Sequence, residues 1–324
     1  MTKQKDEKLP STIELTDSQA PLISQKDTSN PQHHTWLSLQ GGSYNHVWRS
    51  NFDSPQALVP GESYQGPWVL KYAIPSKDPV SNAMNNKHRA VRLWNEINPK
   101  LPKAGLYKRG WVAPYLENSR PATDDEIAQK LVEIFRDTRR ITVDAATKGN
   151  FITLKDTGEV VLVDMDLALK RRTSLASIDF AKNLNTRFAT YWIDPQLHLS
   201  MPKTLEVTRN LLYLEDSLDD NEMDILCQDS KISLKNIQAL TWFRTNKVKL
   251  TYNLFHQISV LNDSDVPLSE TLLEALSVYS QKSVIDPEIE SPRKRGLRYE
   301  FFYPEPRKRN HFDDELPEAQ ARLS

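Results

Sequence analysis

A lysine in a predicted strand and a glutamate in a predicted helix are the first residues whose positions suggest chemistry. Lys71 lies in the middle of the apolar run 68–74, and an ammonium buried in such a strand is costly unless it meets an anion. Glu96 lies twenty-five residues later, in a segment with helical spacing. The simpler interpretations are an edge-strand lysine and a helix carboxylate that both face water.

Two carboxylates directly after an apolar run form the second group. Asp164 and Asp166 follow residues 160–163, which are all apolar and predict a buried strand. Carboxylates at a strand end with an amide nearby, here Asn150, are hard oxygen ligands suited to Mg²⁺ or Mn²⁺. The alternative is that both acids serve turn chemistry or cap a helix.

The first half of the chain must supply the strands that position these residues. Strands are predicted over 36–39, 44–48 and 68–74, and a helix over 81–98. Gly41-Gly42 forms the turn between the first two strands, and Ser81 or Asn82 caps the helix.

A second predicted helix begins at a capping box. Thr123 is followed three residues later by Glu126, so the two ends of this box can satisfy each other's backbone N–H groups. The helical spacing then points Ile127, Leu131, Ile134 and Phe135 inward. A hairpin follows, with strands over 151–154 and 160–163.

Glycine usage separates the two halves of the chain. The 324 residues contain nine glycines, and none lies between 159 and 295. Glycine serves tight turns and close backbone approaches, whereas the second half shows helical periodicity around 204–216, 233–261 and 267–281. The sequence therefore predicts an α+β fold with a small antiparallel β part followed by a mainly helical part.

Composition excludes several classes of protein. The 42 basic and 43 acidic residues give a net charge of −1, which argues against nucleic acid as a partner. No run approaches 18 apolar residues, and the N-terminal residues lack the apolar core of a secretory signal. The single cysteine, Cys227, excludes a disulfide framework and a cysteine-rich zinc site. These features favour a cytosolic protein.

The order of these residues resembles the protein kinase superfamily. That superfamily combines a glycine-rich loop, a strand lysine paired with a helix glutamate, an Asp…Asn catalytic loop and an Asp-Phe-Gly metal site. The corresponding residues here are, in order, Gly41-Gly42, Lys71, Glu96, Asp144…Asn150 and Asp164-Met165-Asp166. The resemblance covers roughly 36–190 and implies a two-lobed fold, with a β lobe over 35–116 and a helical lobe over 117–285.

The resemblance also implies a cofactor and a set of roles. ATP would lie between the lobes, with Gly41, Gly42 and Ser43 at its phosphates and Val112, Pro114 and Tyr115 at its adenine. Lys71 would contact the phosphates and be oriented by Glu96. Asn150, Asp164 and Asp166 would hold Mg²⁺ or Mn²⁺, and Asp144 would accept the proton of the attacking hydroxyl.

Several positions depart from the kinase pattern. The glycine loop is reduced to Gln40-Gly41-Gly42-Ser43, and Thr142-Val143-Asp144 replaces His-Arg-Asp. Asn150 lies six residues after Asp144, where the family has five. These departures indicate a remote and atypical relative. They keep open a pseudokinase that only binds, and an α+β interaction protein without catalysis.

Basic residues form clusters that could receive an anion. They are Lys87, Arg89 and Arg92 in the predicted helix, Lys100, Lys103, Lys108 and Arg109 after it, and Lys170, Arg171 and Arg172 after the predicted metal site. Solvated surfaces are the simpler interpretation. Our hypothesis is that they converge on a polyanion, such as an inositol polyphosphate, that orders the site. The same clusters would suit an inositol or lipid kinase.

The two ends of the chain are polar. Residues 1–34 predict a disordered leader. Residues 286–324 predict a tail with basic and aromatic residues that could lie on an anionic membrane surface. Its acidic end, Asp313 to Glu318, resembles export signals of bacterial type IV effectors such as those of Legionella. This resemblance implies a protein substrate inside a host cell.

Overall fold

The computed structural model describes residues 36–39, 45–77, 82, 85–142, 144–147, 149–169, 199–229 and 231–285. The chain divides into one compact unit over residues 1–280 and a second over 281–324. The fold described below is that of the first unit. It is an α+β fold with a small antiparallel sheet and a mainly helical second half, as the sequence predicts.

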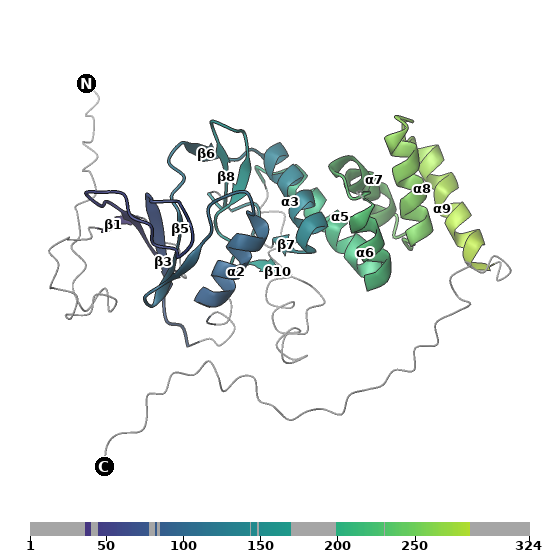
Figure 1. The fold of residues 1–324 in the computed structure, drawn as a ribbon. Coiled ribbons are helices and arrows are strands. Elements are labelled where there is room, and N and C mark those ends of the chain that lie inside the picture. The colour runs from purple at the N-terminus through teal and green to yellow at the C-terminus, as the bar shows by residue number, and fades with distance from the viewer. Residues whose placement is uncertain are drawn as a thin grey trace, which may run out of the picture. The chain divides into compact units, whose positions relative to one another are not determined.

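A five-stranded antiparallel sheet has the strand order β1-β2-β3-β5-β4 (Figure 1). Its strands are β1 (Trp36–Leu39), β2 (Asn45–Ser50), β3 (Trp68–Ala73), β4 (Gly105–Tyr107) and β5 (Gly110–Pro114). Lys71 on β3 is paired with Val47 of β2 and with Trp111 of β5. The lysine therefore lies on an interior strand, and its interpretation as an edge-strand residue is wrong.

The two faces of this sheet pack against different clusters. Trp68, Leu70 and Val112 belong to a cluster on one face, whereas Trp111 and Ala113 join the main core together with helix α2 (Lys87–Ile97). Successive residues of a strand point to opposite faces. Lys71 therefore points to the face that α2 covers.

Helix α2 begins later than the sequence predicts. Its N-cap is Asn86, whose side-chain oxygen accepts hydrogen bonds from the backbone N–H groups of His88 at 2.8 Å and Arg89 at 3.2 Å. An asparagine in this position satisfies backbone donors that Ser81 or Asn82 is too far away to reach.

Helix α3 (Asp124–Thr138) confirms the predicted capping box. Thr123 N–H donates to the Glu126 carboxylate at 2.8 Å, and Glu126 N–H donates to the Thr123 hydroxyl at 3.3 Å. The side chains predicted to point inward are all buried, namely Ile127, Leu131, Ile134 and Phe135.

Two small sheets follow and bring the remaining candidate residues together. β6 (Ser119–Pro121), β8 (Phe151–Leu154) and β9 (Val160–Leu162) form one sheet, and β7 (Ile141–Thr142) pairs with β10 (Ala168–Leu169) in the other. The predicted hairpin is thus confirmed as β8–β9. Because β7 pairs with β10, the chain after β7 and the chain before β10 leave from the same ladder.

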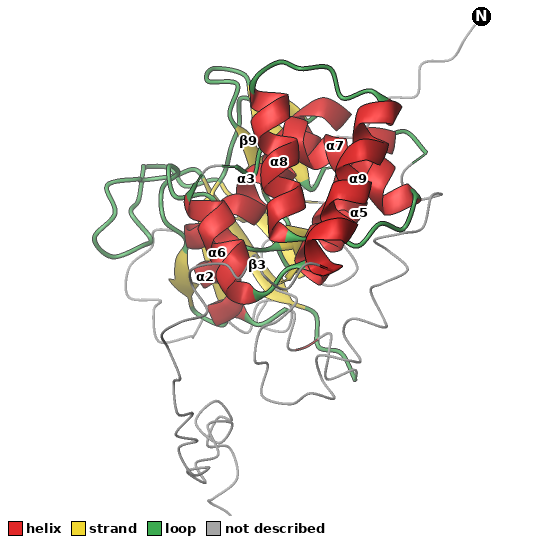
Figure 2. Ribbon diagram, turned by 90° about the vertical axis from the view of Figure 1, so that its right-hand side faces the viewer, coloured by secondary structure: helices red, strands yellow, loops and turns green. Residues whose placement is uncertain are grey.

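The second half is helical, with α5 (Pro202–Ser217), α6 (Asp220–Gln228), α7 (Leu234–Thr245), α8 (Tyr252–Asp263) and α9 (Glu270–Ile285). Helices α3, α5, α7 and α8 contact one another in succession (Figure 1), and Figure 2 looks along this row from the end where α8 and α9 lie. The helical period predicted over 233–261 is two helices. α7 ends where Lys247 takes a left-handed φ of 55°, and the Thr251 hydroxyl caps α8 by accepting from Leu254 N–H. Among the described residues, no helix has both the length and the apolarity needed to span a membrane.

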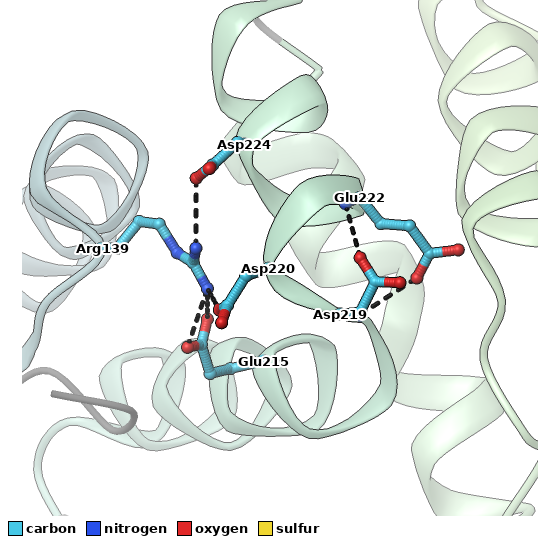
Figure 3. Close-up of polar contacts among 6 residues, drawn as sticks. All are labelled: Arg139, Glu215, Asp219, Asp220, Glu222 and Asp224. Atoms are coloured by element: carbon cyan, nitrogen blue, oxygen red, sulfur yellow. Dashed lines mark hydrogen bonds and ion pairs between the residues drawn. The ribbon is translucent and has the colours of Figure 1, made fainter. Parts of the chain in front are cut away.

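Arg139 joins three helices at the end of α3 (Figure 3). Its guanidinium is 3.1 Å from each of three carboxylates, Glu215 on α5 and Asp220 and Asp224 on α6. Only 3% of the Glu215 side chain is exposed. Arg139 takes a left-handed φ of 54°, which costs a non-glycine residue about 1 kcal/mol. The charge contacts must outweigh this cost.

Replacing Arg139 by glycine separates the two effects. Arg139→Gly removes a backbone cost of about 1 kcal/mol but leaves the buried Glu215 carboxylate without its guanidinium, which costs about 3 kcal/mol. We therefore expect the free energy of unfolding to fall by about 2 kcal/mol in urea titrations.

Lys247 provides the matched control, because it also has a left-handed φ and forms no ion pair among those recorded for the described residues. Lys247→Gly should leave stability unchanged or raise it by up to about 1 kcal/mol. A stabilising effect of Arg139→Gly would show that its carboxylate contacts contribute little.

Candidate active site

Lys71 is fixed by the sheet and donates to a distant segment. Its ammonium donates to the carbonyl oxygen of Val163 at 3.0 Å and lies 5.6 Å from the centre of the Trp111 ring. Strand β5 comes close to it because Gly110 lacks a side chain: a Cβ there would collide with the Lys71 carbonyl oxygen. The hydrogen bond to Val163 places the Lys71 ammonium beside the residue that directly precedes Asp164.

Asn150 connects the two loops that carry the candidate acids. Its amide donates to the Asp144 carboxylate at 2.6 Å and to the Asp144 carbonyl at 3.2 Å. Its own carbonyl accepts from Val163 N–H at 2.9 Å. Asn150 therefore holds Asp144 on one side and the residue before Asp164 on the other, although six residues separate it from Asp144.

Asp144 and Asp166 both have the Asp164 carboxylate as a charged neighbour. Burial, and after it the neighbouring Asp164 carboxylate, raise the pKa of Asp144 to about 7. Burial and Asp164 also raise the pKa of Asp166, while Lys71 and Arg89 oppose that rise. The Asp166 carboxylate accepts from the Asn45 amide on β2 at 2.8 Å.

These side chains suit a hard cation. The Asp144 Oδ1 atom is buried and has no hydrogen-bond partner, which makes it one of a few such atoms among the described residues. Closely spaced carboxylate oxygens with raised pKa values are stabilised by positive charge, and Mg²⁺ binds through one or two carboxylates, substrate phosphates and water. Within the described ranges, no group of three or more His, Cys, Asp or Glu side chains is arranged so that it could hold a metal ion by itself.

Glu96 does not take the partner that we expected. Its carboxylate pairs with Arg140, with distances of 3.0 Å to Nη2 and 3.2 Å to Nε, whereas we expected Lys71. Arg140 directly precedes β7, so helix α2 is tied to the start of the loop that carries Asp144. Lys71 instead uses its ammonium on the Val163 carbonyl.

The predicted nucleotide contacts are only partly described. Gly41, Gly42 and Ser43 lie outside the described residues. The Val112 side chain is fully buried in the cluster with Trp68 and Leu70, on the face of the sheet opposite Lys71, so only its backbone could contact a ligand on the Lys71 face.

The two residues at the end of β5 are engaged with the sheet. Pro114 is buried opposite Trp68. Tyr115 N–H donates to Pro67 O at 2.8 Å, and its ring lies under Arg49.

The basic residues predicted to bind an anion lie in separate parts of the structure. Lys87 on α2 lies next to the β4–β5 turn, where its ammonium is 3.5 Å from the Lys108 carbonyl oxygen. Lys100 instead lines an open groove of about 800 Å³ along α3, whose lining includes no other predicted anion ligand. Lys170, Arg171 and Arg172 lie outside the described residues.

Arg89 points inward and contacts the chain after Asp164. Its guanidinium donates to the carbonyl oxygens of Asp166 at 2.8 Å and Ala168 at 3.2 Å. Our expectations from the sequence include neither this contact nor the roles of Asn45 and Arg140. The pair Arg139-Arg140 directly before the short β-prone run Ile141-Thr142 was the available signal for Arg140. Asn45 and Arg89 offered none, because their partners are distant in sequence.

Comparisons with protein-family models, with curated proteins and with solved structures give no match for this chain. The site is therefore interpreted from its own residues.

The raised pKa of Asp144 predicts a pH-dependent effect of removing its charge. A carboxyl whose pKa rises from 3.8 to about 7 on folding stabilises the native state when protonated, and this contribution is lost as the pH rises through 7. We expect Asp144→Asn to stabilise the metal-free protein in urea titrations, by roughly 1–2 kcal/mol more at pH 8 than at pH 5.5. An equal effect at both pH values would show that Asp144 ionises normally.

Proposed function

We propose that this chain is an ATP- and divalent-metal-dependent phosphotransferase, a remote relative of the protein kinases that phosphorylates a hydroxyl of a protein. One observation carries the proposal. Lys71, Asp144 with Asn150, and Asp164 with Asp166 come from three separate segments, and their contacts bring them into one neighbourhood. In the proposed two-lobed arrangement, the sheet over 35–116 and the helices over 117–285 form the lobes.

Each residue has a role that its environment supports. The Lys71 ammonium has three N–H donors, one of which binds the Val163 carbonyl, and it would contact the phosphates. Asn150, Asp164 and Asp166 offer the oxygens that would hold Mg²⁺ or Mn²⁺, which neutralises phosphate charge when bound. Asp144 has a raised pKa and a free carboxylate oxygen, so it is suited to receive the proton of the attacking hydroxyl.

Positioning and charge would supply the catalysis, because phosphoryl transfer needs little covalent help from a protein.

A binding module without transfer is the second candidate. The observation that favours it is the 2.6 Å bond from Asn150 to Asp144, which occupies one oxygen of the proposed base.

The expected place of action follows from the sequence resemblance. We propose a cytosolic protein that a type IV system delivers to a host cell, where its substrate protein lies. The acidic residues from Asp313 to Glu318 support this proposal by composition alone.

Transfer of labelled phosphate tests the proposed function. Incubation with γ-labelled ATP and Mg²⁺ or Mn²⁺, with and without a host extract, should label protein. Lys71→Met and Asp164→Asn should each reduce the rate at least about a hundredfold, because the first removes a positive charge from the phosphates and the second removes a carboxylate that would hold the metal. Lys235→Met and Asp265→Asn are matched controls from an exposed ion pair, and both should keep the wild-type rate.

Three other outcomes identify the alternatives. Label on lipid or inositol indicates an inositol or lipid kinase. Thermal stabilisation by ATP without transfer indicates the binding module. A chain that shows neither response, or one whose Lys71→Met variant transfers phosphate normally, contradicts the proposal.

We also propose that a polyanion such as an inositol polyphosphate activates the enzyme through the surface where Lys87 meets the β4–β5 turn with Lys108 and Arg109. Calorimetric titration with inositol hexakisphosphate should show binding that Lys87→Gln with Lys108→Gln weakens about tenfold or more. Lys100→Gln, from the separate groove, should not affect it. Absence of heat and of thermal stabilisation would contradict this role.

A further inference from the structure

The segment from Val163 to Ala168 is held by cationic side chains that come from elsewhere in the chain. Lys71 donates to Val163 O at 3.0 Å. Arg89 donates to Asp166 O at 2.8 Å and to Ala168 O at 3.2 Å. The two donors come from β3 and α2. The segment that they hold, from Val163 to Ala168, carries both proposed metal-binding aspartates.

Arg89 reaches the segment from a firmly placed helix. It lies in the first turn of α2, where its backbone N–H is bound by the Asn86 side chain. Leu93, one turn after Arg89 on the same side of α2, and Trp94 anchor the helix in the core and are 0% and 2% exposed. The position of the guanidinium is therefore set by the packing of α2.

The surroundings of Arg89 disfavour the charged form of its guanidinium. Burial, together with the neighbouring Arg140 and Arg92, lowers its pKa to about 10, although the Asp166 carboxylate opposes this shift. A guanidinium offsets such a cost through several directed hydrogen bonds. Its planar fork bridges two carbonyls that lie two residues apart, which a lysine ammonium cannot reproduce.

Glu96 is not the residue through which α2 contacts the segment from Val163 to Ala168. Glu96 pairs with Arg140, and Arg140 itself is 3.5 Å from the Ala168 carbonyl that Arg89 also contacts. Helix α2 therefore contacts the aspartate segment through an arginine bound to backbone carbonyls.

We propose that Arg89 is a positioning residue that locks the segment carrying Asp164 and Asp166 to helix α2. This role differs from the one that the kinase resemblance implies for Glu96, which is to orient Lys71. The role in catalysis rests on the proposed phosphotransfer, whereas the ordering of the segment does not.

Two variants and one control test this role. Arg89→Met removes the guanidinium, and Arg89→Lys keeps the charge and the aliphatic stem in case the first variant unfolds. Arg136→Lys changes an arginine on α3 that pairs with Asp137 at the surface. Hydrogen exchange of the full chain is measured without ligand at the Val163 and Ala168 amides, which donate to Asn150 O and Met165 O.

Both Arg89 variants should exchange these two amides at least about tenfold faster, because losing a hydrogen bond to a charged group favours local opening by that factor. Amides of α5 and α7 should exchange as in the wild type, and Arg136→Lys should change neither region. In phosphotransfer assays, kcat should fall at least about tenfold while the KM for ATP stays within about twofold.

The outcomes separate this inference from the proposed function. Unchanged exchange at Val163 and Ala168 in Arg89→Lys overturns it, as does a raised KM with an unchanged kcat. A wild-type chain without transfer, combined with faster exchange in the variants, contradicts the proposed function and supports the ordering role of Arg89.

Discussion

Three carboxylates that share one partly buried neighbourhood impose the constraint on which the rest of the site depends. Burial and mutual repulsion oppose the ionisation of Asp144 and Asp166, with Asp164 as the common neighbour. Lys71 and Arg89 bring positive charge to the same place. Such a cluster of carboxylates lowers the stability of the folded chain when no ligand is bound. This cost supports the proposal that the site receives a cation and an anionic ligand together.

The surrounding fold holds this cluster from both halves of the chain. Arg139 and Arg140 are adjacent at the end of α3, yet their guanidinium groups bind different elements. Arg139 contacts Glu215 on α5, and Arg140 contacts Glu96 on α2. The two arginines directly before β7 are therefore bound to α5 and to α2, and these contacts fix the start of the loop that carries Asp144. Gly110 adds a further constraint by letting β5 approach β3 at Lys71.

The sequence predicts local features far better than partners. The strand around Lys71, the capping box at Thr123 and the β8–β9 hairpin were predicted because residues close in sequence decide them. The partner of Glu96 was not, because choosing between Lys71 and Arg140 depends on how α2 packs. The break between α7 and α8 was also missed, since a left-handed Lys247 leaves no mark in a periodic apolar pattern.

Calorimetric titration with an ATP analogue that cannot transfer its γ-phosphate tests the central claim most directly, with Mg²⁺ present and with the metal removed. We expect one binding site that requires the metal and that Asp164→Asn weakens about tenfold or more. Asp265→Asn should bind as the wild type does. Binding that is independent of metal and unaffected by Asp164→Asn, or no binding at all, would contradict the account.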